Sequence, residues 1–514
     1  MKRKGLLNST LLIAFNRSAS CILGFIRDIV LAMLFGSSMN FDAYIIASHL
    51  PSFISYAITE SCVTRSFIPL LSEKQTTTNP QEKNKFISQI SGLLLFSIIL
   101  LVAFSIIFAP LIIKIFAPGF IGNYFHSAVV MFRIMAISIL LSTITAFWSG
   151  ILNTLSSYGL PSLTPIITNL LLIIAAVYLS IFFQIPVYSL ACAITIANIL
   201  QCIVLFPAIH KKNMLIKPTL AFSLRDNHKF IRLIMPAFIG VSILQAGVMI
   251  DFIFASYLPS GSITWLYYST RLMELPLSIF GIGIITVMLP SLSRSAAKKN
   301  SEEFGRVLNW SITLTFLIGV PASAGLFCLA GPIVITLFHH GLFNTTDTVM
   351  TIESTKAFAI GIIGFMLTKV CASAFYAKQD TKTPAKIAGI ALLTNILFDF
   401  LLVFHFAHVG LALATSISGI LSGVMLFGLL IKNRHYILST MKARKFAQIT
   451  AATCAMLLIL KITMPASLQW LHQSTEWQIQ HLLLGIVSGV MVYAVVLYGF
   501  GLRSASIFFS EEAT

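Results

Sequence analysis

The sequence contains few charged residues: Asp, Glu, Lys and Arg together make up only 10% of its 514 positions. Soluble globular domains carry about 25% charged residues, so a set of soluble domains of this length is excluded. Hydrophobic residues make up 57% of the chain, and its mean hydropathy is +0.91. These values indicate a protein whose solvent is largely the lipid bilayer.

The signatures of several enzyme classes are also absent. No glycine is followed by lysine, which excludes a Walker A phosphate-binding loop. There is no HExxH zinc motif, and the seven cysteines lie in apolar stretches without CxxC spacing, so neither disulfides nor cysteine metal sites are expected. Because no polar stretch is long enough to form a soluble catalytic domain, we expect a transporter rather than an enzyme.

Long apolar runs recur along the whole chain. A membrane-spanning helix requires about 20 mostly apolar residues, and these runs lack the alternation of a β-barrel strand. The sequence therefore predicts an all-α polytopic membrane protein with about fourteen transmembrane helices. The predicted spans are residues 6–35, 41–70, 86–114, 126–152, 163–183, 187–209, 229–257, 265–290, 308–336, 353–377, 384–404, 408–431, 446–464 and 481–502.

Lys and Arg outnumber Asp and Glu by 34 to 17, and most of them lie in alternate loops between the predicted spans. Basic residues mark cytoplasmic loops, so both termini are predicted in the cytoplasm, as in a multi-pass protein of the bacterial inner membrane. Nucleic acid is not an expected partner, because topology alone accounts for the positive charge. The predicted cytoplasmic segments contain Lys2, Arg3, Lys4, Lys74, Lys83, Lys85, Lys211, Lys212, Lys217, Arg225, Lys229, Arg232, Arg294, Lys298, Lys299, Arg306, Lys378, Lys382, Lys386, Lys432, Arg434, Lys442, Arg444, Lys445 and Arg503.

The two halves of the sequence resemble each other at an offset of about 222 residues. Thr168-Asn169 corresponds to Thr394-Asn395, and Ala109-Pro110 to Gly331-Pro332. Residues 1–210 and 229–432 thus form two copies of six spans each, and parallel repeats of this kind occur in transporters. We predict an N-terminal lobe, a C-terminal lobe and a final helix pair at residues 1–228, 229–440 and 441–514, respectively.

Ionisable residues lie inside several predicted spans, where they are costly unless they face a partner or a water-filled cavity. Guanidinium groups bind phosphate through paired, charge-assisted hydrogen bonds, which makes the arginines among them candidates to bind a phosphate-bearing headgroup. The predicted substrate-binding residues are Arg17, Arg27, Asp28, Asp42, Glu60, Arg65, Arg271 and Glu274.

A structural interpretation of the same residues stays open. Arg27–Asp28 and Arg271–Glu274 have the spacing of ion pairs, and arginines at helix ends also extend to the interface. Lys356, Lys369 and Arg133 are expected to pair or to extend to the interface rather than to bind substrate. Pro51, Pro69, Pro236, Pro276 and Pro290 are candidate hinges, since proline interrupts helices.

A second group of polar residues indicates an ion site. Asn395 and Asp399 are one helical turn apart on one face, and Asp251 and Thr415 are further candidates. Oxygen ligands of this kind suit a hard cation, so a Na⁺ site is predicted. The alternative is a protonated aspartate buried among the helices.

Several motifs resemble the MurJ (MviN) family of lipid II flippases, which belongs to the multidrug/oligosaccharidyl-lipid/polysaccharide exporter superfamily. The resemblance covers nearly the whole chain. The motifs are Leu23-Gly-Phe-Ile-Arg27-Asp28, Leu50-Pro51, Phe67-Ile-Pro-Leu-Leu, Tyr267-Tyr…Arg271-Leu-Met-Glu274-Leu-Pro276, Leu289-Pro-Ser-Leu-Ser and Phe375-Tyr-Ala-Lys-Gln-Asp-Thr-Lys-Thr-Pro384.

The resemblance implies two pseudo-symmetric six-helix lobes in a V around a cationic cavity, and two C-terminal helices that form a groove for a lipid tail. It implies lipid II, undecaprenyl-pyrophosphoryl-MurNAc-pentapeptide-GlcNAc, as the substrate of a monomer in contact with membrane lipids. The family's cavity residues correspond to Arg27, Asp42 and Arg271. Its sodium site corresponds to Asp251, Asn395, Asp399, the Leu411 carbonyl and Thr415.

The sequence departs from the family pattern at Cys21, His49 and Ser55, where other members have basic residues, and Arg17 is a candidate substitute for the first of them. Two further functions stay open: a flippase for another polyprenyl-linked glycan, and a cation-coupled multidrug antiporter. The coupling ion, the stem peptide of the substrate and contacts with the cell-wall synthesis machinery are not determined by the sequence.

Overall fold

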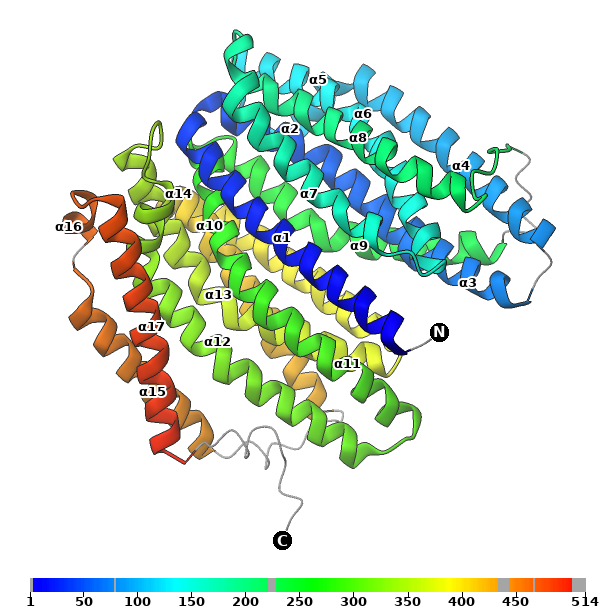
Figure 1. Cartoon of the computed structure of the whole chain (residues 1–514). Coiled ribbons are helices and arrows are strands. Elements are labelled where there is room, and N and C mark those ends of the chain that lie inside the picture. Colours follow the sequence, from blue (N-terminus) through cyan, green and yellow to red (C-terminus); the bar gives the residue numbers. More distant parts are fainter. Residues whose placement is uncertain (1–2, 78–79, 221–227, 433–442, 466, 502–514) are drawn as a thin grey trace. The chain divides into compact units, whose positions relative to one another are not determined.

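The computed structural model describes residues 3–77, 80–220, 228–432, 443–465 and 467–501. The topology markers Lys2, Arg225, Arg434, Lys442 and Arg503 lie outside these described residues. Within them the regular structure is helical throughout, and no strand occurs. The contacts divide the chain into two compact units, residues 1–261 and 262–514 (Figure 1).

In the first unit, α6 packs against α2, α4 and α8, α1 packs against α7, and α9 packs against α2 and η1. An apolar core fills the space between α4, α6 and η1, where the rings of Phe67 and Phe147 lie 4.5 Å apart. The elements are α1 (Arg3–Phe35), α2 (Met39–Ile58), η1 (Thr59–Phe67), α3 (Ile68–Thr77), α4 (Pro80–Ile107), α5 (Ala109–Phe116), α6 (Gly122–Thr154), α7 (Gly159–Ile174), η2 (Ala175–Leu179), η3 (Ser180–Phe182), α8 (Tyr188–Lys211) and α9 (His228–Ala255).

In the second unit, α13 packs against both α12 and α14, while α15 and α17 form a pair beside α12 (Figure 1). Helices α13 and α14 approach closely at Gly364, where an added Cβ would lie 2.5 Å from the Cα of Ile420. Small residues permit such close contacts between membrane helices. The elements are α10 (Ser262–Pro276), η4 (Leu277–Gly281), α11 (Ile282–Ala297), α12 (Ser301–Phe338), α13 (Thr345–Ala377), α14 (Lys382–Lys432), α15 (Ala443–Thr463), α16 (Ser467–Leu471) and α17 (Thr475–Gly499).

Twelve helices in the described part of the chain are long and apolar enough to cross a membrane. The 51-residue α14 contains two helices, because Ala407 between them has a φ of +48° and Gly410 lies against Leu402. The continuous run from α2 to α3 carries Glu60 and Arg65 and falls outside the count of twelve. The predicted all-α polytopic fold with about fourteen spans is confirmed.

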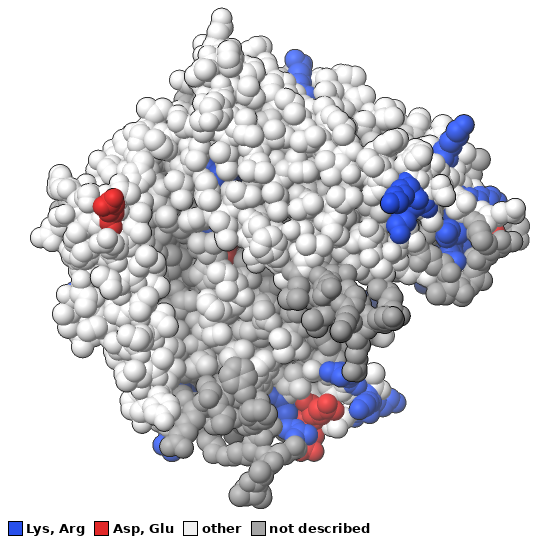
Figure 2. All heavy atoms as spheres, viewed as in Figure 1, with Lys and Arg blue, Asp and Glu red and all other residues white. Residues whose placement is uncertain are grey.

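The helices expose apolar side chains, as expected for contact with lipid. Phe104 of α4 and Leu393 and Phe404 of α14 are 51%, 68% and 74% exposed, respectively. Figure 2 shows broad stretches of surface without charged side chains, while Lys and Arg of the first unit gather near α3 and the start of α4. Charge and apolar surface are therefore separated along the helices, as a bilayer requires.

The contacts group α9 with the first unit. The predicted boundary at residue 228 divides the sequence repeat, in which α9 begins the second copy, and it stays a prediction. The proposed final pair, residues 441–514, contains α15 and α17, which pack together within the second unit.

Candidate functional site

Arg27 of α1, the most enclosed of the candidate arginines, takes part in a hydrogen-bonded network. Its Nε and Nη2 atoms donate to Asp28 Oδ1 at 3.0 and 2.7 Å, and its Nη1 atom donates to Asn169 Oδ1 of α7 at 2.9 Å. Asn169 in turn donates to the Ser20 carbonyl at 3.0 Å. The Arg27 side chain is only 15% exposed and that of Asp28 is 4% exposed. Arg27 and Asp28 therefore form the ion pair that the structural interpretation described, and the bond from Arg27 to Asn169 ties α1 to α7.

Two other predicted residues of the first unit have different surroundings. Arg17 is exposed on α1, about two to three helical turns before Arg27. Asp42 is 2% exposed, and its Oδ2 atom accepts a hydrogen bond of 2.6 Å from the backbone N–H of Gly261. Gly261 has a φ of +97°, a conformation that glycine adopts without strain. Asp42 thus holds the turn before α10, which is a structural role.

Glu60 and Arg65 lie together in η1, where Arg65 Nε donates to Glu60 Oε1 at 3.0 Å. Their side chains are 26% and 49% exposed. η1 is a π-helix that follows Pro51 in the second helix of the first copy, and the π-helix η4 directly follows Pro276 in the corresponding helix of the second copy. Each copy therefore has a π-helix in or beside its predicted charged residues. π-helical turns often mark functional sites.

Arg271 is more accessible than Arg27. Its Nη1 atom donates to Glu274 Oε2 at 3.0 Å, and its guanidinium lies 5.0 Å from the centre of the Tyr267 ring. The Arg271 and Glu274 side chains are 35% and 48% exposed. Lys369 of α13 interacts electrostatically with Glu274, so two cations flank this carboxylate.

The predicted ion ligands of the second unit meet within α14, where its two helices face each other. Asn395 Nδ2 lies 3.4 Å from both Asp399 Oδ1 and Thr415 Oγ1, and Thr415 Oγ1 donates to the Leu411 carbonyl at 3.0 Å. Asp399 is fully buried. Carboxylate, hydroxyl and carbonyl oxygens are the ligand types that a hard cation such as Na⁺ prefers, while Asn395 presents its Nδ2 group to Asp399 and Thr415.

Asp251, the remaining predicted ligand, lies half-buried on α9 in the first unit. Among the described residues, no group of three His, Cys, Asp or Glu side chains is placed to hold a metal ion. The α14 cluster does not depend on such a group, because most of its oxygens come from neutral residues.

The three positions that depart from the family pattern, Ser55, His49 and Cys21, have different surroundings. Ser55 accepts a hydrogen bond of 2.8 Å from Ser142 of α6, and the ring of His49 lies edge-on to Phe252 with centres 4.9 Å apart. Cys21 is exposed on α1. Arg133 donates to the Ile106 carbonyl at 3.2 Å, which agrees with the expected structural role for this cation.

Two of the quoted motifs meet at one end of the second unit, around a cavity of about 610 Å³ lined by Ser293, Lys299 and Lys378, among others. Lys378 lies 4.5 Å from the centre of the Phe304 ring, and burial lowers its pKa. Asp380 accepts hydrogen bonds from the backbone N–H groups of Lys382 and Thr383 and from the Thr383 hydroxyl. These bonds fix the start of α14, which gives this part of the motif a structural purpose.

Reasoning from the sequence missed Asn169 and Lys369 as site residues. The repeat contained a signal for Asn169, because it corresponds to Asn395 of the predicted ion site. Lys369 was expected to pair or to extend to the interface, but its neighbour Glu274 could not be named, since it is distant in the sequence and on another helix. Such a contact depends on how the helices pack.

The helical fold, with charged and polar residues held inside apolar helices, defines a polytopic membrane transporter. Solved structures share this fold. An inward-facing multidrug resistance transporter of the MATE family and MOP superfamily has a TM-score of 0.67 at 13% identity, covering 81% of this chain and 94% of that chain. At this identity the likeness concerns the fold alone.

The chain belongs to the lipid II flippase MurJ family, whose profile matches residues 31–487. It is 33% identical over 501 residues to the "Probable lipid II flippase MurJ" of Haemophilus influenzae, covering 94% of this chain and 98% of that protein. It is 32% identical to the "Lipid II flippase MurJ" of Burkholderia cenocepacia, with coverages of 84% and 85%.

A solved structure named "Lipid II flippase MurJ, inward closed conformation" aligns with a TM-score of 0.81 at 28% identity, covering 96% of this chain and all of that chain. The resemblance noted in the sequence is therefore confirmed, as is the expectation of a transporter rather than an enzyme.

Proposed function

We propose that this chain moves lipid II from the cytoplasmic to the outer leaflet of the bacterial inner membrane by alternating access. The observation that carries the proposal is the alignment with named lipid II flippases over nearly their whole length. Both termini are on the cytoplasmic side in this proposal, which the distribution of Lys and Arg supports.

The arginines provide the charge that a pyrophosphate requires. Arg271 is the leading contact, because its guanidinium is partly exposed beside Tyr267. In this proposal the pyrophosphate replaces Glu274 as the partner of this guanidinium. Arg27 is enclosed by Asp28, which balances its charge, and by Asn169, so it fixes α1 against α7. A membrane potential contributes about 2.3 kcal/mol per charge per 100 mV. Na⁺ bound at Asn395, Asp399 and Thr415 is a second energy source in this proposal.

Complementation of a conditional flippase-depletion strain tests the function. Wild type is expected to restore growth and the appearance of lipid II on the outer face of the membrane, and Arg271→Ala is expected to fail at equal membrane level. Arg271→Lys keeps the charge and is expected to rescue in part. Arg133→Ala is the matched control, because Arg133 is an exposed cation in a membrane helix that is bonded to a backbone carbonyl.

The outcomes separate the alternatives. Failure of well-expressed wild type to rescue would contradict lipid II as the substrate and would favour another polyprenyl-linked glycan or a cation-coupled drug antiporter. Full rescue by Arg271→Ala would retain the function and remove Arg271 from the headgroup site.

A further inference from the structure

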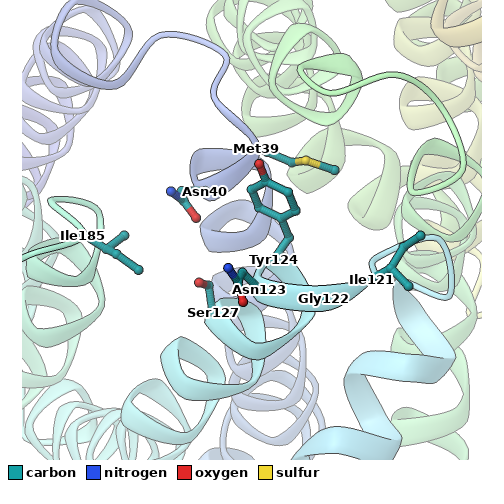
Figure 3. A pocket seen from close by; sticks show the side chains of 8 residues that line it. All are labelled: Met39, Asn40, Ile121, Gly122, Asn123, Tyr124, Ser127 and Ile185. Carbon is teal, nitrogen blue, oxygen red and sulfur yellow. The ribbon is translucent and has the colours of Figure 1, made fainter.

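The first unit contains a cavity of about 590 Å³ at the end of the helices away from Lys74, Lys83 and Lys211. Three segments form it: the start of α2, the start of α6 and the turn before α8 (Figure 3). These three helix starts follow loops that are outer loops in the proposed topology. None of the residues that line the cavity is charged.

Polar groups from two helices line this cavity. Asn40 of α2 and Asn123 of α6 are the carboxamides labelled in Figure 3, and each carboxamide supplies two N–H donors and one oxygen acceptor. Ser127 is 3% exposed and accepts a hydrogen bond of 3.3 Å from the Tyr188 hydroxyl. The hydroxyl of Ser127 is therefore held in place by α8 without any ligand.

The first turn of α6 adds further donors and one aromatic face. Gly122 has a φ of +62°, which lets the chain turn sharply into the helix. The N-cap residue, Ile121, has no side-chain acceptor for the first backbone N–H groups of the helix. The ring of Tyr124 is 38% exposed beside them, and its π face attracts polarised C–H groups.

The lining excludes several kinds of ligand. A phosphate would require cations, and a metal ion would require carboxylates or imidazoles. Met39, Ile121 and Ile185 form an apolar part of the wall beside the polar groups. Two amides, a hydroxyl, backbone N–H groups and one aromatic ring suit a neutral ligand with many hydroxyl and amide groups. Small-molecule sites span about 300–1,000 Å³, so the cavity has room for one or two sugar rings.

We propose that this cavity is a saccharide subsite, which holds the neutral, N-acetylated sugar portion of the headgroup on the outer side of the membrane. The proposal rests on the proposed function for the identity of the sugar and on the proposed topology for the side. It separates two tasks within one molecule: arginines bind the pyrophosphate during transfer, and the amide-lined cavity binds the sugars on the outer side.

The test uses the purified full-length protein and N,N′-diacetylchitobiose as the probe, with binding measured by saturation-transfer NMR and calorimetry. Wild type is expected to bind it, and Asn40→Ala and Asn123→Ala are each expected to raise the Kd about 10-fold through lost hydrogen bonds. Tyr124→Ala is expected to weaken binding similarly, and Tyr124→Phe to keep it. Tyr257→Ala is the matched control, because Tyr257 is 67% exposed in the same unit and does not line the cavity.

Absence of binding to wild type would overturn the proposal, as would equal binding by the Asn40→Ala and Asn123→Ala variants at unchanged thermal stability. Displacement of the sugar by inorganic pyrophosphate would also overturn it, because that result would show an anion site. Arg271→Ala is expected to bind the sugar normally. Sugar binding by a wild type that fails to rescue the depleted strain would contradict the proposed function and leave the subsite standing.

Discussion

Corresponding asparagines in the two copies of the repeat, Asn169 and Asn395, have partners of different charge. In the first unit, Asn169 of α7 accepts a hydrogen bond from Arg27, whose guanidinium also binds the buried Asp28. In the second unit, the Nδ2 atom of the corresponding Asn395 lies 3.4 Å from Asp399 Oδ1 and Thr415 Oγ1. One copy places a guanidinium at its asparagine, and the other places a carboxylate there.

The repeat extends this difference to the first helix of each copy. At nearly the same offset, Arg27-Asp28 corresponds to Ile250-Asp251. The second copy therefore has the carboxylate without the adjacent guanidinium. In the proposed function a bound cation balances the negative charge there. The comparison teaches that the two copies share their polar positions, while the basic residue beside the carboxylate occurs only in the first copy.

The largest expected effect comes from removing the internal balance of the first copy. Asp28→Asn leaves the Arg27 guanidinium buried without its carboxylate, and breaking a buried ion pair costs about 3–5 kcal/mol. Thermal unfolding in detergent is expected to show a marked loss of stability. Glu73→Gln is the control, since its pair with Lys229 is 54% and 73% exposed and such pairs contribute about 0–1 kcal/mol. Equal losses in both variants would show that Asp28 is not the balancing group.

The next effect tests the ion dependence of the second copy. Na⁺ is expected to stabilise wild type by about 2.7 kcal/mol at a concentration of 100 times its Kd, and Asn395→Ala is expected to abolish this gain. Asn169→Ala removes the corresponding asparagine of the first copy and is expected to lower stability equally in Na⁺ and in choline. Thermal unfolding in both salts measures the difference. A Na⁺ gain that survives Asn395→Ala, or disappears with Asn169→Ala, would reverse the assignment.

Much of this architecture was predictable from the sequence, because hydropathy and the placement of Lys and Arg follow directly from the bilayer. The adjacent pair Arg27–Asp28 and the one-turn pair Asn395–Asp399 were also predictable, since each is local in sequence. Contacts between helices were not, because the apolar faces of these helices resemble one another. The contact of Asn169 with Arg27 therefore became visible only in the packed helices, and the bond from Gly261 to Asp42 depends on a loop conformation that no pattern encodes.

Helix packing provides the third prediction, because the two copies also differ there. Gly364 brings α13 close to α14, whereas the corresponding Ser142 of the first copy uses its hydroxyl to bind Ser55. Gly364→Ala places a Cβ 2.5 Å from backbone atoms of Ile420, and overpacking of this kind costs about 1–3 kcal/mol. Gly389→Ala on α14 is the control, because nothing lies within 4 Å of its added Cβ. Thermal unfolding that does not distinguish the two variants would contradict the close approach.

The smallest expected effect concerns the turns that precede α7 and α14, where Ser157 corresponds to Asp380. Hydrogen bonds from the Thr383 hydroxyl, followed by those from backbone N–H groups, lower the pKa of Asp380. The ionised carboxylate therefore stabilises the start of α14 above its unfolded pKa of about 4, and this contribution is lost as the pH falls through the lowered folded pKa.

Asp380→Ala is expected to cost about 1 kcal/mol, as the loss of a helix cap does. It is also expected to remove the acid dependence of amide hydrogen exchange at Lys382 and Thr383. Ser157→Ala is the matched control and is expected to change little, because the cap of α7 has no side-chain hydrogen bond. Similar exchange at the start of α14 in wild type and Asp380→Ala at pH 6 would mean that the carboxylate does not hold this turn, and the two copies would then begin these helices in the same way.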